Sequence, residues 1–182
     1  MKITILNGNP DSEKKDFEKH VNSLSNLISE KNQVEVLNLR DFNIKYCTGC
    51  WSCWVKTCGE CVTKDASHLI DEKVINSDFI IAVSPLLMGF ISTELKKTMD
   101  KLIPLLRPYI DIVNGECHHQ KRYSKYPKWG VIIEKEVDTD EEDLQICKEI
   151  FERFTLNFRS ELAFFTTTET KPEEIANEIS NI

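Results

Sequence analysis

The chain has 182 residues, of which 41% are hydrophobic and 29% are charged, and its formal net charge is -7. These proportions are ordinary for a globular protein, and the length suits one domain with a full core. The negative charge argues against a nucleic-acid partner, which would need a basic face, and no apolar run reaches the roughly 20 residues of a membrane span.

The chain begins on an apolar run, residues 1–6, which is typical of a core strand rather than a signal peptide. We therefore expect a cytoplasmic protein whose seven cysteines are kept reduced. In a reducing compartment, clustered cysteines favour metal, redox or free-thiol roles over structural disulfides.

Short apolar runs alternate with helical stripes along the whole chain. Each run is rich in β-branched residues, and each stripe repeats its apolar residues every three or four positions. The expected strands are 2–6, 34–39, 79–83, 129–133 and 162–166. The expected helix starts are Asp11 or Ser12, Asp65, Ser92, a Thr139/Glu142 capping box and a Thr170/Glu173 capping box. The helix after Ser92 carries its stripe to Leu106, and residues 108–127 are expected to be irregular.

This alternation, without repeats or linkers, predicts an α/β fold in which helices cover both faces of a parallel sheet, as one domain over residues 1–182. For five strands we expect a flavodoxin-like, doubly wound sheet with strand order 2-1-3-4-5. Such sheets bind ligands outside the carboxyl ends of their strands, at the switch point between strands 1 and 3. The loops 8–16 and 84–92 are expected there, with the loop after the second strand beside them.

The loop after the second strand, residues 46–64, holds five of the seven cysteines. They are Cys47, Cys50, Cys53, Cys58 and Cys61. The first three, followed by either of the last two, have a spacing that would let four sulfurs converge on one metal ion or one iron–sulfur cluster. Two other interpretations stay open: reduced thiols half-buried beside the two tryptophans of the loop, or one reversible disulfide.

Three stretches resemble the NAD(P)H-dependent FMN reductase family of flavodoxin-like proteins, and the resemblance extends over about residues 1–108. Residues 6–11, LNGNPD, resemble the phosphate loop of its quinone reductase branch. Residues 47–65, with the pattern C-x2-C-x2-C-W-x-K-T-x-G-x-C-x3-D, resemble a cysteine signature that iron–sulfur flavoproteins share in related form. Residues 84–100, with the pattern S-P-x3-G-x2-S-x2-L-K-x3-D, resemble the flavin loop and its helix.

The resemblance implies an FMN-dependent oxidoreductase, in which NAD(P)H reduces the flavin and a small electron acceptor such as a quinone reoxidises it. It implies that the cofactor contacts come from the phosphate loop and the flavin loop. The residues expected to bind FMN are Gly8, Asn9, Pro10, Asp11, Ser12, Lys15, Phe17, Pro85, Leu86, Leu87, Met88 and Gly89. No side chain is a clear acid or base, so no catalytic residue is assigned.

The resemblance also bears on the cysteines. It implies a possible [4Fe–4S] cluster, and because the family pattern keeps a cysteine at 61 but usually not at 58, Cys61 is the expected fourth ligand. The expected metal ligands are Cys47, Cys50, Cys53 and Cys61. The same signature also occurs in family members without a cluster, and the same thiols could hold zinc.

The chain departs from the family pattern in several places: Leu87 and Met88 stand where the flavin loop usually has Tyr and Phe, and Cys58 stands where the cysteine signature usually has Pro. Two further departures add acidic residues. Asp11, Glu13 and Asp16 put acidic side chains beside the expected phosphate site, where two lysines offset them only in part. After the fourth strand, the sequence EKEVD of residues 134–138 stands where the family has two glycines.

An alternative function is a non-catalytic, metal- or thiol-bearing interaction module on a degenerate flavodoxin-like scaffold, because a fold alone does not imply a function. The absorption spectrum of the purified protein separates the two, since flavins and iron–sulfur clusters absorb visible light. We expect a homodimer or homotetramer, because Trp51, Trp54 and residues 108–127 supply spare aromatic surface.

Overall fold

The computed structural model describes all residues from Met1 to Ile182 and contains a six-stranded sheet and a separate two-stranded sheet. The main sheet has the order β2-β1-β3-β7-β8, with neighbouring strands parallel along this path, and β4 pairs with the end of β3. Its strands are β1 Lys2–Asn7, β2 Gln33–Asn38, β3 Phe79–Leu87, β4 Phe90–Ile91, β7 Lys128–Glu134 and β8 Leu162–Thr167. The predicted order 2-1-3-4-5 is confirmed, because β7 and β8 are the fourth and fifth parallel strands.

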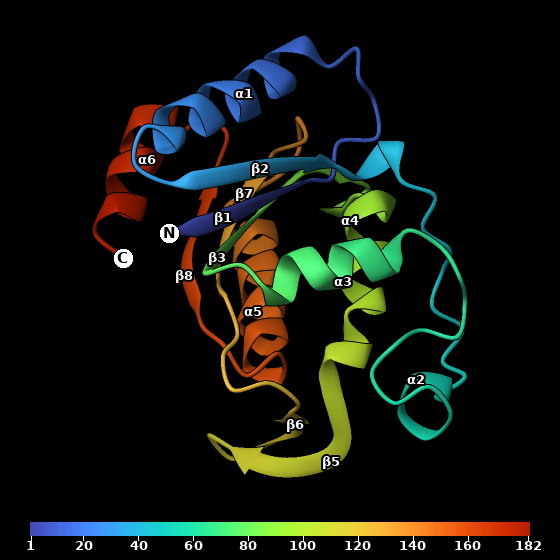
Figure 1. The fold of residues 1–182 in the computed structure, drawn as a ribbon. Coiled ribbons are helices and arrows are strands. Elements are labelled where there is room, and N and C mark those ends of the chain that lie inside the picture. The colour runs from blue at the N-terminus through green and yellow to red at the C-terminus, as the bar shows by residue number, and fades with distance from the viewer.

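Helices cover both faces of this sheet, as predicted (Figure 1). α1 and α6 lie together on one face, and α3, α4 and α5 cover the other. The helices are α1 Lys15–Ser29, α2 Ser52–Val55, α3 Ser67–Ile75, α4 Thr93–Lys101, α5 Glu141–Asn157 and α6 Pro172–Ser180, with the 3-10 helices η1 Leu39–Asp41 and η2 Ile103–Leu105. None of these helices has the length and the apolar character needed to cross a membrane.

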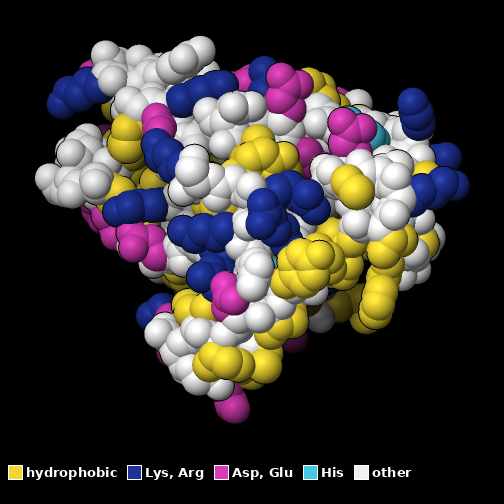
Figure 2. Space-filling model, turned by 60° about the horizontal axis from the view of Figure 1, so that its bottom comes forward, with side chains coloured by type: hydrophobic (Ala, Val, Ile, Leu, Met, Phe, Trp, Pro, Cys, Tyr) yellow, Lys and Arg dark blue, Asp and Glu magenta, His cyan; other side chains and the backbone are white.

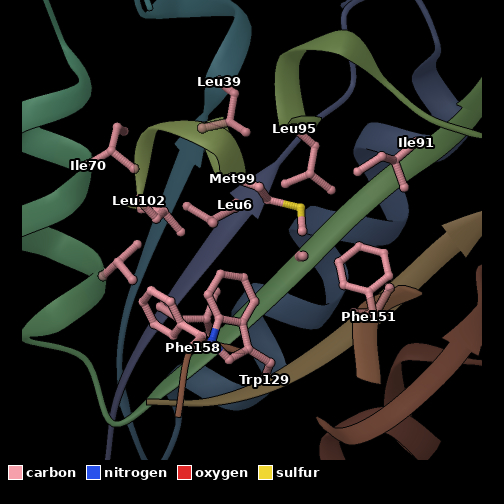
Figure 3. Packing of buried hydrophobic residues seen from close by; sticks show 14 of the residues in the cluster. Leu6, Leu39, Ile70, Ile91, Leu95, Met99, Leu102, Trp129, Phe151 and Phe158 are labelled. Atoms are coloured by element: carbon pink, nitrogen blue, oxygen red, sulfur yellow. The ribbon is translucent and has the colours of Figure 1, made fainter. Parts of the chain in front are cut away.

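The central strand β3 begins with an uninterrupted apolar run, residues 79–83, because both of its faces are covered. Phe79, Ile81 and Val83 face the core under α1 and α6, while Ile80 and Ala82 face the larger core under α3, α4 and α5. A strand covered on both faces needs apolar residues at every position. Figure 3 shows the larger core, in which aromatic rings from β7 and α5 pack against aliphatic side chains of α3 and α4.

Several expected helix starts are wrong. α1 begins at Lys15 without a side-chain cap, and Asp11 instead accepts a hydrogen bond from the amide of Glu13, at 2.9 Å, within the loop. The capping box of α5 is Asp140 with Asp143, one residue after the expected pair. Short polar side chains that cap a helix also form local turns, so the sequence alone did not separate the two roles.

The start of α3 agrees with the prediction, whereas that of α6 does not. Ala66 directly precedes α3 and has no side-chain cap, but the Asp65 carboxylate accepts from the amide of Ser67 at 2.9 Å, so Asp65 caps the first turn. α6 begins at Pro172 after an uncapped Lys171, and the expected cap Thr170 pairs its hydroxyl with Thr166 at 2.7 Å. Ser92 does cap α4, accepting from the amide of Leu95 at 3.2 Å, as predicted.

The prediction that residues 108–127 are irregular is wrong, because most of them belong to a β-hairpin. Its strands are β5 Leu106–Val113 and β6 Glu116–Lys121, which pair antiparallel. Asn114 and Gly115 form its turn with φ values of 52° and 82°. An Asn-Gly pair is the sequence best suited to such a turn, so the signal for this hairpin was present.

The hairpin leaves the sheet at its amino edge, where the parallel strands begin. α4 ends at Lys101 rather than continuing to Leu106, and η2 leads into β5. The Tyr126 hydroxyl, two residues before β7 begins, donates to the carbonyl of Leu105 at 2.6 Å. Figure 1 shows the hairpin and α2 together at this end of the molecule, away from the carboxyl ends of β1 and β3.

Candidate flavin edge and cysteine cavity

The loop after β1 and the loop after β3 lie side by side at the carboxyl edge of the sheet, as predicted. The amide of Gly8 donates to the carbonyl of Val83 at 2.7 Å, and the Ser92 hydroxyl donates to the carbonyl of Gly8 at 2.5 Å. A Cβ at Gly8 would lie 2.9 Å from Leu95 Cβ, so only glycine permits this approach. We call the two loops, residues 8–17 and 84–92, the flavin edge.

The first loop of the flavin edge is fixed by Glu18. Its carboxylate accepts from Asn9 Nδ2 at 2.7 Å and Arg40 Nη1 at 2.8 Å, and also from Asn7 Nδ2. Burial would raise the pKa of this carboxyl, but the hydrogen bonds from Arg40, Asn9 and Asn7 outweigh burial and lower it. The acidic side chain is therefore part of the scaffold of the loop.

The structure separates the expected flavin contacts of this loop into two groups. Phe17 is buried in the core, and Gly8 and Asn9 are buried within the loop. The exposed members are Pro10, Asp11, Ser12 and Lys15. The amides of Asp16 and Phe17 stand in the first turn of α1, where a helix offers no intrahelical acceptor, so they are donors available to an anion.

The second loop is a β-hairpin rather than an irregular loop. β3 extends to Leu87 and pairs with β4, and Met88 and Gly89 form the tip with φ values of 57° and 75°. Pro85 and Leu86 are buried, and Leu86 belongs to the larger core. Leu87, Met88 and Gly89 are exposed, so only the tip can meet a ligand.

An acidic segment, residues 134–138, follows β7 and contacts both loops of the flavin edge. The Glu136 carboxylate accepts from the amides of Met88 at 2.9 Å and Gly89 at 2.8 Å. These two N–H groups hold the pKa of Glu136 below its usual value. Glu134 pairs with Lys14 at 2.6 Å. The sequence flagged this segment as a departure from the family but did not predict its contacts.

The cysteine loop, residues 46–64, does not lie at the flavin edge, so the prediction that three loops meet there is wrong. It lines a cavity of about 430 Å³ whose other walls are the end of α4, η2 and the end of α5. Helices that connect parallel strands run antiparallel to them, so these ends lie at the amino edge. Trp54 anchors the loop there, since its Nε1–H donates to the carbonyl of Leu106 at 3.0 Å.

Four cysteines of the loop line this cavity and the fifth does not. The lining cysteines are Cys47, Cys50, Cys53 and Cys61. Cys58 is exposed and has φ of 43°, and its thiol faces the carbonyl of Trp54 at 3.8 Å. The structure therefore brings the four predicted ligand thiols to one cavity.

The thiols of the cavity differ in their surroundings. Burial raises the pKa of Cys53, and the charges of Cys47, Cys61 and Cys50 raise it further. The pKa of the exposed Cys50 is lowered, mainly by a hydrogen bond from Ser52. Such a set of thiols suits an iron–sulfur cluster or zinc in its donor chemistry. However, no three His, Cys, Asp or Glu side chains are arranged here to hold a metal ion.

A buried lysine, Lys101 at the end of α4, links the cavity to a carboxylate. Its Nζ donates to Cys61 Sγ at 3.0 Å and pairs with Asp65 at 3.3 Å. Burial would raise the pKa of Asp65, but hydrogen bonds from Ser67 and the Lys45 amide, together with the Lys101 charge, lower it to about 2. Burial would also lower the pKa of Lys101, but the Cys61 hydrogen bond and the charges of Cys61 and Asp65 raise it. Nothing in the sequence distinguishes Lys101 from other lysines at helix ends.

A second buried carboxyl, Asp71 on α3, lies near the same lysine but lacks a hydrogen bond at Oδ1. Burial raises its pKa to about 8, although the Lys101 charge acts in the opposite direction. Asp71 is therefore protonated at neutral pH. Of the two buried carboxyls, Asp65 therefore carries the negative charge that pairs with the buried ammonium group of Lys101.

Comparison with known proteins assigns the family. A model of the NADPH-dependent FMN reductase family matches residues 1–119, which is well over half of the chain. The chain belongs to this family. The matched residues include both loops of the flavin edge, the cysteine loop and the β5–β6 hairpin as far as His119.

Curated relatives match part of this chain, and solved structures share its fold. Two iron–sulfur flavoproteins of Archaeoglobus fulgidus are 32% identical over 82 residues and 28% identical over 106 residues, covering 45% and 56% of this chain. These matches span only 36% and 48% of those two proteins. Two Bacillus anthracis structures share the fold. An azoreductase aligns at TM-score 0.66 and 13% identity, over 100% of this chain and 93% of the azoreductase chain. An FMN-dependent NADH-azoreductase in complex with FMN aligns at TM-score 0.58 and 18% identity, over 99% of this chain and 94% of the azoreductase chain.

Proposed function

We propose that this chain is an FMN-dependent oxidoreductase that transfers electrons from NAD(P)H through FMN to a quinone or another small acceptor. The observation that carries the proposal is the flavin edge, where the loops after β1 and β3 are joined by hydrogen bonds at the switch point of the sheet. Ligands of this fold bind at that point. The match of the family model includes both loops.

The exposed groups of the flavin edge suit FMN. The amides of Asp16 and Phe17, with Lys14 and Lys15 beside them, suit a phosphate. At the tip of the second loop, two adjacent amides donate to the partly exposed carboxylate of Glu136, which stands in for a hydrogen-bond acceptor on the flavin ring. FMN, when bound, supplies the hydride and electron chemistry, and the protein residues bind and orient it.

The test uses two matched glycines. Gly89 and Gly115 each occupy a two-residue hairpin turn with positive φ, of 75° and 82°, and a Cβ at either would meet open space. Gly89→Val should weaken FMN binding at least tenfold in a fluorescence titration and slow NADPH-dependent quinone reduction. Gly115→Val carries the same backbone strain away from the flavin edge and should leave FMN affinity within twofold. Equal FMN affinity in both variants would remove the second loop from the site.

We also propose that the cavity thiols hold a [4Fe–4S] cluster, with Cys47, Cys50, Cys53 and Cys61 as ligands. Support comes from their common cavity, from the exclusion of Cys58, and from the names of the curated relatives. Because these side chains are not arranged to hold a metal ion in the structure, binding of the cluster requires the loop to rearrange around it. All seven cysteines are free thiols in the structure, which suits a reducing cytoplasm as the proposed location.

For assembly we propose a homodimer or homotetramer. The amino edge exposes large apolar side chains from the cysteine loop and the hairpin, and Figure 2, which turns this end forward, shows them beside Lys and Arg side chains. They include Tyr46, Trp51, Val55, Tyr109 and Ile112. Exposed apolar surface of this kind marks contact sites. Light scattering that gives the mass of a single chain at micromolar concentration would reject this proposal.

A further inference from the structure

The acidic segment occupies the two groups of donors that a flavin phosphate and a flavin ring would use. Glu136 takes both amides of the hairpin tip, and Glu134 takes the ammonium group of Lys14. The segment begins where β7 ends, at Glu134, and the Glu136 amide donates to the Thr139 hydroxyl at 2.9 Å. Its backbone is thus held in place, and the carboxylates of Glu134 and Glu136 reach the flavin edge from the neighbouring strand.

The backbone shape of the hairpin tip lets one carboxylate accept hydrogen bonds from two amides. Met88 and Gly89 both have positive φ, a backbone shape in which successive N–H groups point to the same side and bind an anion. Hydrogen bonds to an ionised acceptor are stronger than those to a neutral carbonyl. A neutral acceptor on a flavin ring must therefore displace a better acceptor that is already in place.

We propose that the acidic segment is an internal competitor for the flavin, which makes FMN an exchangeable ligand of this protein rather than a tightly retained one. Glu136 competes with the flavin ring for the tip amides, and Glu134 competes with the flavin phosphate for Lys14. The inference rests on the proposed function, because it takes the flavin to bind at the flavin edge.

The two carboxylates weaken flavin binding only moderately, because both are accessible to water. Glu134 keeps 27% of its side-chain surface exposed, and Glu136 is also partly exposed. A displaced carboxylate regains hydration, so its release costs much less than the release of a buried charge. We expect each glutamate to weaken flavin binding several-fold, and both together to weaken it more than tenfold.

The experiment compares two flavins on four variants. Riboflavin has the same ring as FMN but no phosphate. Glu136→Ala should tighten the binding of both flavins about fivefold to tenfold, because the ring donors are freed. Glu134→Gln should tighten FMN several-fold and leave riboflavin unchanged, because only the phosphate gains Lys14. The double variant should show both gains and should retain FMN through gel filtration.

Asp138→Ala is the matched control, because it removes one charge from the same segment at an exposed residue that makes no hydrogen bond or ion pair in the structure. It should change riboflavin affinity by less than twofold. A gain equal to that of Glu136→Ala would show that only net charge matters, and would overturn the proposal. Unchanged or weaker flavin binding in Glu136→Ala would overturn it as well.

Two further outcomes separate this proposal from the proposed function. If the double variant and the wild type both fail to bind either flavin, the flavin site itself is rejected, and the competitor with it. If all variants bind flavin equally, the flavin site stands and only the competitor is rejected. In flavin-free protein, the Met88 and Gly89 amide NMR signals should shift in Glu136→Ala but not in Asp138→Ala, and unchanged signals would contradict the contact directly.

Discussion

The flavin edge and the cysteine cavity lie at opposite ends of the same sheet and are built in different ways. The flavin edge is made of backbone hydrogen bonds between two loops, such as Gly8 to Val83, that follow directly from strand order. The cavity is made of side chains from the ends of α4 and α5 and one long loop. Topology fixes the first site, whereas packing of individual side chains fixes the second.

The largest expected effect distinguishes the cysteines of the cavity from the one outside it. In protein purified without oxygen, Cys61→Ser should abolish bound iron and acid-labile sulfide, because a cluster needs four thiolates. Cys58→Ser should keep both, because Cys58 lies outside the cavity. The measurement is iron and sulfide per chain. Iron lost in Cys58→Ser but kept in Cys61→Ser would reverse the assignment, and wild-type protein without iron would end it.

The next effect concerns the buried lysine beside the cavity. Lys101→Met should lower the free energy of unfolding by about 3–5 kcal/mol, because it leaves the Asp65 carboxylate buried without its ion pair. Lys96→Met on the same helix removes an exposed pair with Asp100 and should cost less than about 1 kcal/mol. Urea denaturation measures both. Similar losses in the two variants would show that Lys101 is not held as a buried charge.

An increase in the free energy of unfolding is expected when Asp71 is replaced by Asn. The pKa of Asp71 is about 8 in the folded state and 3.8 ordinarily, so the unfolded chain releases this proton first as the pH rises. The contribution of Asp71 to the stability of the wild type should therefore fall between pH 4 and pH 8. Asp71→Asn keeps a neutral group at all pH values and should be more stable than the wild type by at least about 1 kcal/mol at pH 8, but not at pH 4.

The exposed neighbour Glu72 supplies the control for this pH dependence. Glu72→Gln should follow the wild type from pH 4 to pH 8, when thermal unfolding is measured across the range. An Asp71→Asn variant that is destabilised equally at both pH values would show that Asp71 is ionised in the folded protein.

Particular residues show how far the sequence could predict this molecule. Uninterrupted apolar runs such as residues 79–83 predicted the parallel strands, and the flavodoxin-like order expected for five such strands placed Gly8 beside the loop after β3. Asn114-Gly115 carried the signal for the β5–β6 hairpin, although the polar composition of its surroundings suggested an irregular segment.

Other features could not be predicted because they depend on tertiary contacts. The path of the cysteine loop to the amino edge depends on where Trp54 finds a hydrogen-bond acceptor. Lys101 resembles any lysine at a helix end until the packing of α4 buries it against Cys61. Similarly, the acidic residues 134–138 stood out in the sequence, but only the structure shows Glu136 at the hairpin tip.

The most direct test of the central claim, that flavin binds at the carboxyl edge and away from the cysteine cavity, is to follow the amide NMR spectrum during an FMN titration. The account predicts that the amides of Asp16, Met88 and Gly89 shift, together with their neighbours at the flavin edge. Amides of residues 47–61 and 154–158, which line or adjoin the cavity, should stay unchanged. Shifts confined to the cavity residues, with the flavin edge unchanged, would contradict the account.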